Sequence, residues 1–290
     1  MPHMANTVVV KPCRSKEWIL RVRTALAAVA VVIMVPVALL LSPTPSAEPP
    51  AQLFAGDYAS GDFSQWLTVQ TKAYNGPAAD YPPGYPASIV QDSKGDVARF
   101  EVRKGDVPPF GGGERAEVQG DSWSTGGAEG EVRWYKFSTK FDTSFPKNHA
   151  DLGWGVTNQW HPDSDVGSPP VSWTVGMRNG YWSLTISDQS APDAYLGTFS
   201  IFDTPLAPGE WHDVKMQIRW SESATGGSIK LWLNGVPQKF ANGTDTYVGR
   251  TLIPGTTSVY YKEGMYRAPM APTDIVYHTG FGAADSEDAL

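Results

Sequence analysis

The sequence after about residue 50 predicts an all-β fold, a jelly-roll (concanavalin-like) β-sandwich of two antiparallel sheets. Short runs rich in aromatic and β-branched residues are separated by Gly, Pro, Asn and Asp. Helical periodicity is almost absent, and no repeat of fixed period is found, which disfavours a propeller or a solenoid. At this length, a two-sheet jelly roll is the architecture that fits best.

The strand-like runs extend to residue 284 and are joined by turn sequences. Asn179-Gly180 lies between two alternating segments, which is the strongest short-range signal of a hairpin. Asn234-Gly235 predicts a second tight turn. The expected strand regions are 96–104, 131–142, 170–188, 211–221, 228–236, 258–267 and 273–284.

The first 47 residues have the features of a targeting segment. Five basic residues and one acidic residue precede an uncharged apolar run at 24–41, and small residues follow near Ala47. This pattern favours a secretory signal peptide over an N-terminal membrane anchor, although the run is just long enough to span a bilayer. We therefore expect a signal peptide or anchor at 1–47, a Pro-rich linker at 48–52 and a jelly-roll domain at 53–290.

Charge and cysteine content exclude several classes of function. The single cysteine, Cys13, lies in the leader, so the domain has no disulfide, thiolate metal site or cysteine nucleophile. Without the leader, 18 basic residues stand against 29 acidic ones, a net charge near −11. This charge argues against nucleic acid as the main partner, and it also disfavours a densely sulfated polyanion unless basic residues concentrate in one groove.

Two short segments place polar side chains on one face of a strand. In 114–119, alternation puts Arg115 and Glu117 on the same face, and in 157–162 it does so for Gln159 and His161. Trp160 points to the opposite face, which predicts that it belongs to the core. Taken singly, such residues are more often a surface salt bridge and a structural histidine than a functional site.

The segment 258–267 carries a third polar face. Tyr260, Lys262, Gly264 and Tyr266 share one side, which is poor material for a core and is typical of a groove. A glycine in mid-strand also indicates that something approaches its backbone closely. Most of the tryptophans and tyrosines are expected in the core, while a few could line a sugar-binding groove.

The side chains on these three faces suit removal of a proton beside a carboxylate. An arginine and an amide can neutralise a uronate carboxylate and so stabilise the charge that develops when the C5 proton leaves. A histidine or tyrosine can take that proton, and a tyrosine can protonate the leaving oxygen at C4. The sequence has no G-x-S-x-G nucleophile motif and no alternating acidic motif of a glycosidase.

The motifs "RAEV", "QWH" and "YYKEGMYR" resemble the three signature strands of jelly-roll polysaccharide lyases. This superfamily includes the alginate lyase, heparin lyase I and glucuronan lyase families. Together with "GEWHDVKMQIRWS" and "LWLNGV", the motifs look most like the heparin lyase I-type family, and the likeness runs from residue 54 to residue 282. Each motif is weak alone, but their order and spacing are fairly specific.

The resemblance implies a role for each matching residue. The catalytic residues expected from it are Arg115, Gln159, His161 and Tyr266, and the expected substrate-binding residues are Lys262, Glu117, Tyr260 and Asn158. The last strand continues with Arg267 where alginate lyases favour a different sequence, which weakens alginate as the substrate. No cofactor is expected for the chemistry. Some relatives hold a structural calcium ion, and no site for one can be placed on this sequence.

We therefore expect a secreted, monomeric polysaccharide lyase that cleaves a 4-linked uronic-acid-containing polysaccharide by β-elimination and leaves 4,5-unsaturated uronate ends. The expected partner is an anionic polysaccharide of the glucuronan, alginate or glycosaminoglycan type, with glucuronan favoured over heparin. The sequence leaves two alternatives open. One is a non-catalytic carbohydrate-binding module or lectin, and the other is a jelly-roll glycoside hydrolase with a carboxylate pair.

Overall fold

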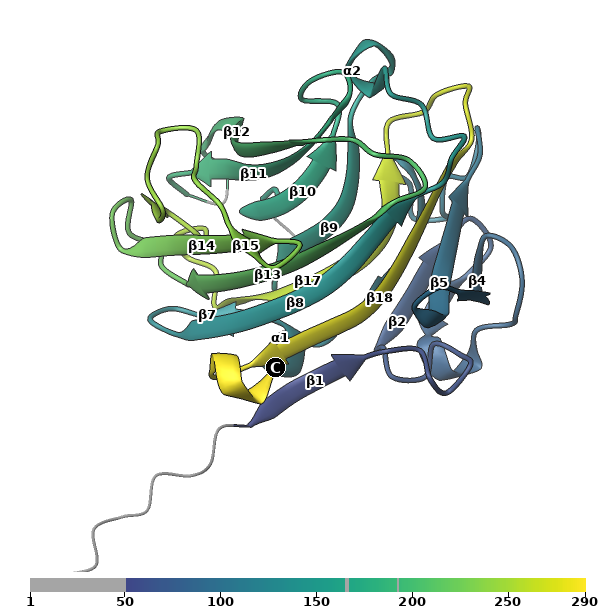
Figure 1. Ribbon diagram of the computed structural model, residues 1–290, viewed down its shortest axis with the longest axis horizontal. Coiled ribbons are helices and arrows are strands. Elements are labelled where there is room, and N and C mark those ends of the chain that lie inside the picture. Colours follow the sequence, from purple (N-terminus) through teal and green to yellow (C-terminus); the bar gives the residue numbers. More distant parts are fainter. Residues whose placement is uncertain (1–50, 165–166, 192) are drawn as a thin grey trace, which may run out of the picture. The chain divides into compact units, whose positions relative to one another are not determined.

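Two nine-stranded antiparallel sheets make up the fold in the computed structural model, which describes residues 51–164, 167–191 and 193–290 (Figure 1). The predicted jelly-roll class is confirmed. The predicted leader at 1–47 and the first residues of the linker lie outside the described residues. Within the described part of the chain, no helix is long and apolar enough to cross a membrane.

Sheet I has a path of seven strands, with β1 beside β18 and β16 beside β14. Because β1 begins at Gln52, the first strand includes the last residue of the predicted linker. In spatial order the sheet contains β15 (Val236–Pro237), β14 (Gly227–Leu233), β13 (Trp211–Arg219), β8 (Val132–Phe141), β18 (Asp274–Ala284), β5 (Gly95–Val102) and β4 (Ala87–Asp92), together with β1 (Gln52–Gly56) and β16 (Tyr247–Gly249).

Sheet II has a path of eight strands, with β7 beside β17. Its spatial order is β12 (Tyr195–Pro205), β11 (Tyr181–Gln189), β10 (Val171–Val175), β9 (Gly155–Pro162), β17 (Ser258–Arg267), β6 (Glu114–Gln119), β2 (Thr68–Thr71) and β3 (Asn75–Pro77), together with β7 (Gly127–Ala128). Short helical turns occupy the loops at η1 (Ala78–Asp80), α1 (Ser122–Thr125), α2 (His149–Leu152) and η2 (Glu287–Ala289).

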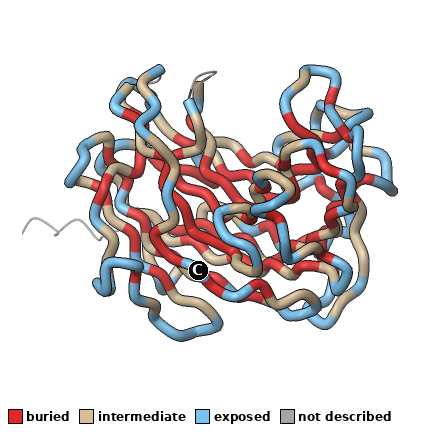
Figure 2. Tube along the Cα trace, turned by 90° about the horizontal axis from the view of Figure 1, so that it is seen from above, coloured by how far each residue is buried: buried red, intermediate tan, exposed pale blue. Residues whose placement is uncertain are grey.

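The core lies between the sheets and is dominated by aromatic rings. Tyr261 of β17 stacks on Phe281 of β18 at 3.8 Å between ring centroids, which joins sheet II to sheet I. Trp160 of β9 packs against Tyr261 at 5.1 Å and is fully buried, as predicted. Figure 2 shows buried residues along the strands and exposed residues in the loops. Each buried aromatic ring contributes roughly 1.5–3 kcal/mol through the hydrophobic effect.

The two Asn-Gly sequences behave differently. Asn234 and Gly235 form a two-residue turn, because both have positive φ (52° and 78°) and Leu233 pairs with Val236. The β10–β11 hairpin is also present, but β10 ends at Val175 and β11 begins at Tyr181, so residues 176–180 connect the strands. The sequence signal thus predicted both hairpins correctly and the length of only one connection.

Candidate active site

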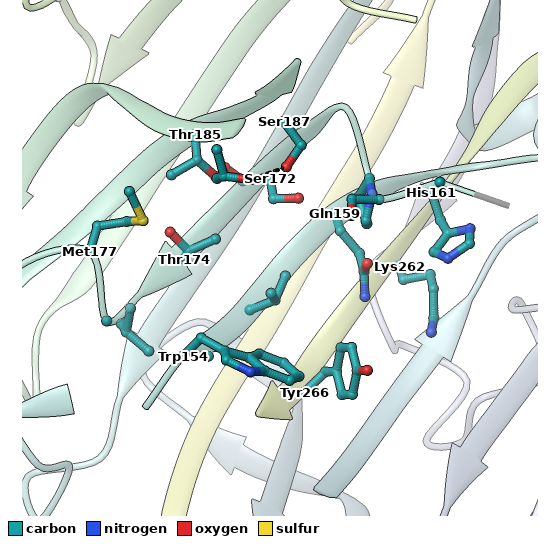
Figure 3. Close-up of a pocket in the computed structure, with 18 of the residues that line it drawn as sticks. Trp154, Gln159, His161, Ser172, Thr174, Met177, Thr185, Ser187, Lys262 and Tyr266 are labelled. Carbon is teal, nitrogen blue, oxygen red and sulfur yellow. Dashed lines mark hydrogen bonds between the residues drawn. The ribbon is translucent and has the colours of Figure 1, made fainter. Parts of the chain in front are cut away.

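A cavity of about 570 Å³ opens on the face of sheet II that points away from sheet I, which we call the groove face. Its lining comes from β6, β9, β10, β11, β12 and β17 and from the loops beside them (Figure 3). The cavity is lined by Arg115, Trp154, Gly155, Val156, Gln159, His161, Gly167, Ser168, Pro169, Ser172, Thr174, Val175, Gly176, Met177, Thr185, Ser187, Tyr195, Thr198, Lys262 and Tyr266.

Strand pairing brings the three predicted polar faces together. The central strand β17 lies between β6 and β9, so its groove-facing side chains meet those of both neighbours. Tyr266 is directly opposite Arg115 on β6, and Lys262 is opposite Gln159 on β9. Three segments that are well separated in the sequence therefore form one cluster. We call this cluster the charged end of the groove, and it consists of Arg115, Glu117, Gln159, His161, Lys262 and Tyr266.

Tyr266 is held by its ring, and its hydroxyl group is left for a ligand. The Arg115 guanidinium lies over the ring at 3.8 Å from the centroid, and Trp154 packs edge-on against it at 4.7 Å. Within the described part of the chain, the Tyr266 hydroxyl has no hydrogen-bond partner. Arg115 also has donors to spare, since its buried Nε has no partner there either. A phenol and a guanidinium with unused donors therefore face the same cavity.

Glu117 lies beneath the charged end of the groove and contacts three of its side chains. Its Oε1 accepts a hydrogen bond of 2.6 Å from Gln159 Nε2, and its Oε2 accepts one of 2.7 Å from Lys262 Nζ. Arg115 Nη1 lies 3.4 Å from the same Oε2. Burial alone would raise the pKa of the Glu117 carboxyl, but the charges of Lys262 and Arg115 outweigh it and lower that pKa. Glu117 is therefore a buried anion that positions three neighbours.

Gln159 has a hydrogen-bond donor left for a ligand, whereas the Lys262 ammonium is already bound by two side chains. The Gln159 amide uses one N–H on Glu117, so its second N–H remains as a donor at the cavity wall. The Lys262 ammonium is bound to Glu117 and, at 2.7 Å, to Gln70 Oε1 of β2. Gln70 was not predicted as a site residue, although alternation in the short strand "TVQT" places it on the groove face beside Glu117.

His161 is fixed in one tautomer. Its Nδ1 lies 2.9 Å from the Pro162 carbonyl oxygen, which can only accept a hydrogen bond, so the proton is on Nδ1. The lone pair is then on Nε2, where it can accept a proton. Burial lowers the pKa of His161, and the charge of Lys262 lowers it further. His161 is thus a neutral imidazole at neutral pH, as a general base must be.

Gly264 explains how β17 stays close to β6. A Cβ at this position would lie 2.2 Å from the Ala116 carbonyl oxygen, and its φ of +141° is one that other residues rarely adopt. A glycine in mid-strand predicted a close approach at Gly264, and the approaching group is the backbone of β6. This approach keeps Tyr266 in register with Arg115.

A bulge in β9 redirects the residues before Gln159. Trp173 of β10 pairs with Asn158, and the next residue of β10 pairs with Val156, so Thr157 is an extra residue. Thr157 and Asn158 both point between the sheets, and the residues that precede them return to the groove. Trp154 reaches the cavity in this way, and strict alternation could not predict it.

Three predicted substrate-binding residues have other positions. Asn158 is fully buried between the sheets, where its Nδ2 donates to the Tyr261 hydroxyl at 2.7 Å, so the prediction that it contacts substrate is wrong. Glu117 is 2% exposed and both of its oxygens are engaged, so it positions the ligand-facing groups instead of contacting substrate. Tyr260 stacks on His161 at 5.3 Å and lies outside the cavity lining.

Metal-binding residues do not gather in the described part of the chain. It contains no group of three or more His, Cys, Asp or Glu side chains that could hold a metal ion. Asp163 lies 3.3 Å from the hydroxyls of Ser122 and Ser258. A calcium site stays a prediction.

The chain belongs to a polysaccharide lyase family. The family model described as polysaccharide lyase matches residues 58–281, which cover nearly all of the described sandwich. The chain is therefore a polysaccharide lyase, and this agrees with the cavity and with the signature strands that line it. Among curated proteins, none is similar enough in sequence to match the chain.

Solved structures share the fold at low sequence identity. An endo-β-1,4-glucuronan lyase from the fungus Trichoderma reesei superposes with a TM-score of 0.60 at 15% identity, covering 81% of this chain and 96% of that one. The family 7 alginate lyase A1-II′ gives 0.55 at 15% identity, with coverages of 80% and 100%. The catalytic domain of a glycoside hydrolase family 131 protein from Coprinopsis cinerea gives 0.51 at 11% identity, with coverages of 82% and 95%. These likenesses show the fold alone.

Proposed function

We propose that the protein cleaves a 4-linked, uronate-containing polysaccharide by β-elimination and leaves a 4,5-unsaturated uronate at the new end. The observation that carries this proposal is the charged end of the groove. There, Arg115 and Gln159 offer free N–H donors beside the unpartnered hydroxyl of Tyr266 and the neutral imidazole of His161. These are the groups that proton removal beside a carboxylate requires.

Neutralisation of the substrate carboxylate is the first requirement of the reaction. The C5 proton of a uronate is poorly acidic because the neighbouring carboxylate is already negative. Hydrogen bonds from Arg115 and Gln159 would stabilise the additional charge that develops on this carboxylate as the proton leaves. The C5–H electrons then form the C4–C5 double bond, the C4–O bond breaks, and its oxygen receives a proton.

Tyr266 is the proposed proton carrier. In 4-linked glucuronate or mannuronate the C5 proton and the C4 oxygen lie on the same side, so one tyrosine could serve both. In guluronate or iduronate they lie on opposite sides, and Nε2 of His161 would take the proton while Tyr266 protonates the leaving oxygen. The geometry of the site is compatible with both forms, and the polymer decides between them.

The hydrolase and lectin alternatives are less well supported. A glycosidase needs two carboxyl groups across the scissile bond, and no Asp or Glu lines the cavity within the described residues. Glu117, the carboxylate behind the lining, is engaged by three neighbours. A lectin has no need of a neutral histidine and a free tyrosine hydroxyl at one point. Membership of a polysaccharide lyase family also argues against both.

The test is the Tyr266→Phe variant, because it removes the proton carrier and keeps the ring that packs against Arg115 and Trp154. We expect kcat/KM to fall about 10²–10⁴-fold. Activity would be measured as the absorbance of the unsaturated uronate on glucuronan, alginate, heparin and hyaluronan. The matched control is Tyr277→Phe, which removes a hydroxyl on sheet I and should keep full activity. Retention of most activity in Tyr266→Phe would contradict the assignment.

We further propose that the enzyme is exported through the leader at 1–47, is monomeric and needs no cofactor for the chemistry. The charge pattern of the leader and the self-contained lyase site support these proposals. N-terminal sequencing of the secreted form and its mass in solution test the first two. Activity after treatment with a chelator tests the last, and it also tests whether a structural calcium ion is required.

A further inference from the structure

The groove has a second part whose lining is uncharged. Across β10, β11 and β12 the cavity is walled by hydroxyl side chains, which Figure 3 shows on the side away from His161 and Lys262. Within the described residues, no Lys, Arg, Asp or Glu lines this part. We call it the hydroxyl arm, and it consists of Ser172, Thr174, Thr185, Ser187, Tyr195 and Thr198.

The hydroxyl groups of this arm are arranged to bind other hydroxyl groups. Ser187 and Thr198 share a hydrogen bond of 2.6 Å, and the Tyr195 hydroxyl donates to Thr198 at 2.7 Å. Thr174 Oγ1 is buried and has no partner within the described part of the chain. Each hydroxyl can donate one hydrogen bond and accept two, so the arm retains capacity of both kinds. Sugar hydroxyls need such mixed partners.

Fixed charge is distributed unequally between the two parts of the groove. The charged end holds two cations, Arg115 and Lys262, and one buried anion, Glu117, so its net charge matches a single substrate carboxylate. The hydroxyl arm adds no cation. A second carboxylate bound there would lose water without gaining an opposite charge, which is unfavourable.

The outer edge of the arm carries an anion. Asp203 of β12 pairs with Ser183 of β11, and Ser183 pairs with Thr174 of the hydroxyl arm on β10. Asp203 therefore lies two strands away from the cavity wall, a distance of about 10 Å. Its Oδ1 accepts hydrogen bonds from Ser183 at 2.7 Å and Ser200 at 2.6 Å, and it forms no salt bridge within the described residues.

Two basic residues near this edge do not reverse that charge. Arg178 packs over the ring of Tyr181 at 4.0 Å, and Arg250 is paired with Asp188. The edge of the arm therefore has about as many negative as positive groups. In contrast to the charged end, it offers no net attraction for a uronate.

We propose that the groove binds one carboxylate, at the charged end, and binds the neighbouring sugars of the chain through hydroxyl groups in the hydroxyl arm and at Asp203. The preferred substrate is then an unsulfated polysaccharide in which 4-linked uronate alternates with an uncharged sugar. This inference rests on the proposed elimination reaction and specifies its substrate class. A homopolymer of uronate places a carboxylate at each position and so brings one toward Asp203.

The experiment compares an alternating polymer, hyaluronan, with a uronate homopolymer, glucuronan. Both are measured by kcat/KM of the wild-type enzyme and by Kd with the inactive Tyr266→Phe variant. We expect hyaluronan to be preferred in both measurements. Asp203→Lys should shift the preference toward glucuronan roughly fivefold, the factor that corresponds to two unit charges a few ångströms apart in water. Asp203→Asn is the matched control and should shift it less.

Repeating the measurements at higher salt separates charge effects from hydroxyl contacts. Screening should reduce the shift in preference caused by Asp203→Lys, whereas binding through hydroxyl contacts should not change. The inference would be overturned if the enzyme bound and cleaved glucuronan as well as hyaluronan. It would also be overturned if Asp203→Lys left the preference between the two polymers unchanged. A wild-type enzyme that binds hyaluronan but yields no unsaturated product from any polymer would overturn the proposed elimination and leave the binding inference supported. Thermal unfolding of both Asp203 variants checks that each is folded.

Discussion

The two faces of sheet II each bury a glutamate, and the two side chains have opposite surroundings. On the groove face, Glu117 is bound by Lys262 and Gln159, and its pKa is lowered despite burial. On the face toward sheet I, Glu263 accepts hydrogen bonds from Tyr58 at 2.6 Å and Tyr261 at 3.1 Å and has no cation partner within the described residues. Burial raises the pKa of Glu263 to about 8.

The difference shows how the surroundings of a buried carboxyl group decide whether it is charged or neutral. A buried charge is tolerated only where an opposite charge compensates for the lost water. The groove face supplies that compensation and so maintains fixed charges at the cavity. Around Glu263 the interior face supplies only the hydroxyl groups of Tyr58 and Tyr261, so Glu263 stays protonated at neutral pH and acts as a neutral hydrogen-bonding group between the sheets. Elsewhere between the sheets, the buried Glu114 is compensated by Arg267.

The largest effect is expected from Glu117→Gln, which leaves Lys262 buried without its anion. Loss of one partner of a buried ion pair costs about 3–5 kcal/mol in the free energy of unfolding. Activity should also fall, because Gln159 and Arg115 lose the group that positions them. Urea denaturation and the elimination assay measure the two effects.

The double variant Glu117→Gln/Lys262→Met serves as the control for this prediction. It removes both charges, so it should recover part of the stability that the single variant loses, without recovering activity. If the single variant were as stable as the wild type, the ion pair would not have the compensating role that we assign to it.

A smaller effect, of opposite sign, is expected from Glu263→Gln. Because folding raises the pKa of Glu263, the native state holds a proton that the unfolded chain releases between the ordinary glutamate value and about 8. Stability of the wild type should therefore fall as pH rises through this window and level off above it. The glutamine variant lacks this loss, so above pH 8 it should be more stable by roughly 1–3 kcal/mol.

The measurement is the free energy of unfolding as a function of pH for both proteins. The Glu117 carboxyl gives the reverse dependence, since its lowered pKa adds stability above the ordinary value that is lost as pH falls. Parallel curves for the wild type and Glu263→Gln would show that Glu263 is charged in the folded protein, contrary to our assignment.

Alternation along single strands predicted much of this arrangement. It placed Arg115, Gln159 and Tyr266 on groove-facing positions and Trp160 in the core, and the structure agrees. Alternation also predicted which side chains of β17 lie on its groove face and which lie on its opposite face. The many short strands and their turns were enough to predict the jelly-roll class.

The remaining features depend on pairing between distant segments. The bulge in β9 is defined by its register with β10, and it turns Asn158 inward and Trp154 toward the cavity. Burial of Glu263 depends on the sheet that covers it, and the partnership of Lys262 with Gln70 depends on the order of the strands. No local pattern contains this information.

Trp154 allows a weaker test of the groove face. Its edge-on contact with Tyr266 is of a kind that contributes about 0.5–1.5 kcal/mol, so Trp154→Leu should lower kcat/KM by roughly three- to tenfold. The free energy of unfolding should change little, because the indole is 45% exposed. Trp123→Leu, which removes a more exposed indole, is the matched control. Equal activity in both variants would show that Trp154 does not position the tyrosine.

The smallest effect concerns two histidines, one on each side of sheet II. Burial lowers the pKa of both, that of His161 on the groove face and that of His278 between the sheets, the latter to about 3. His161 should therefore titrate below the ordinary histidine value while His278 stays neutral throughout that range, as NMR of the imidazole protons would show. Because protonation removes the lone pair of Nε2, kcat/KM on a polymer that needs His161 as base should rise with pH through the pKa of His161 and be constant above it. A His161 pKa above the ordinary value would mean that Glu117 outweighs both burial and the neighbouring cations, and the groove face could then not supply a neutral base near pH 7.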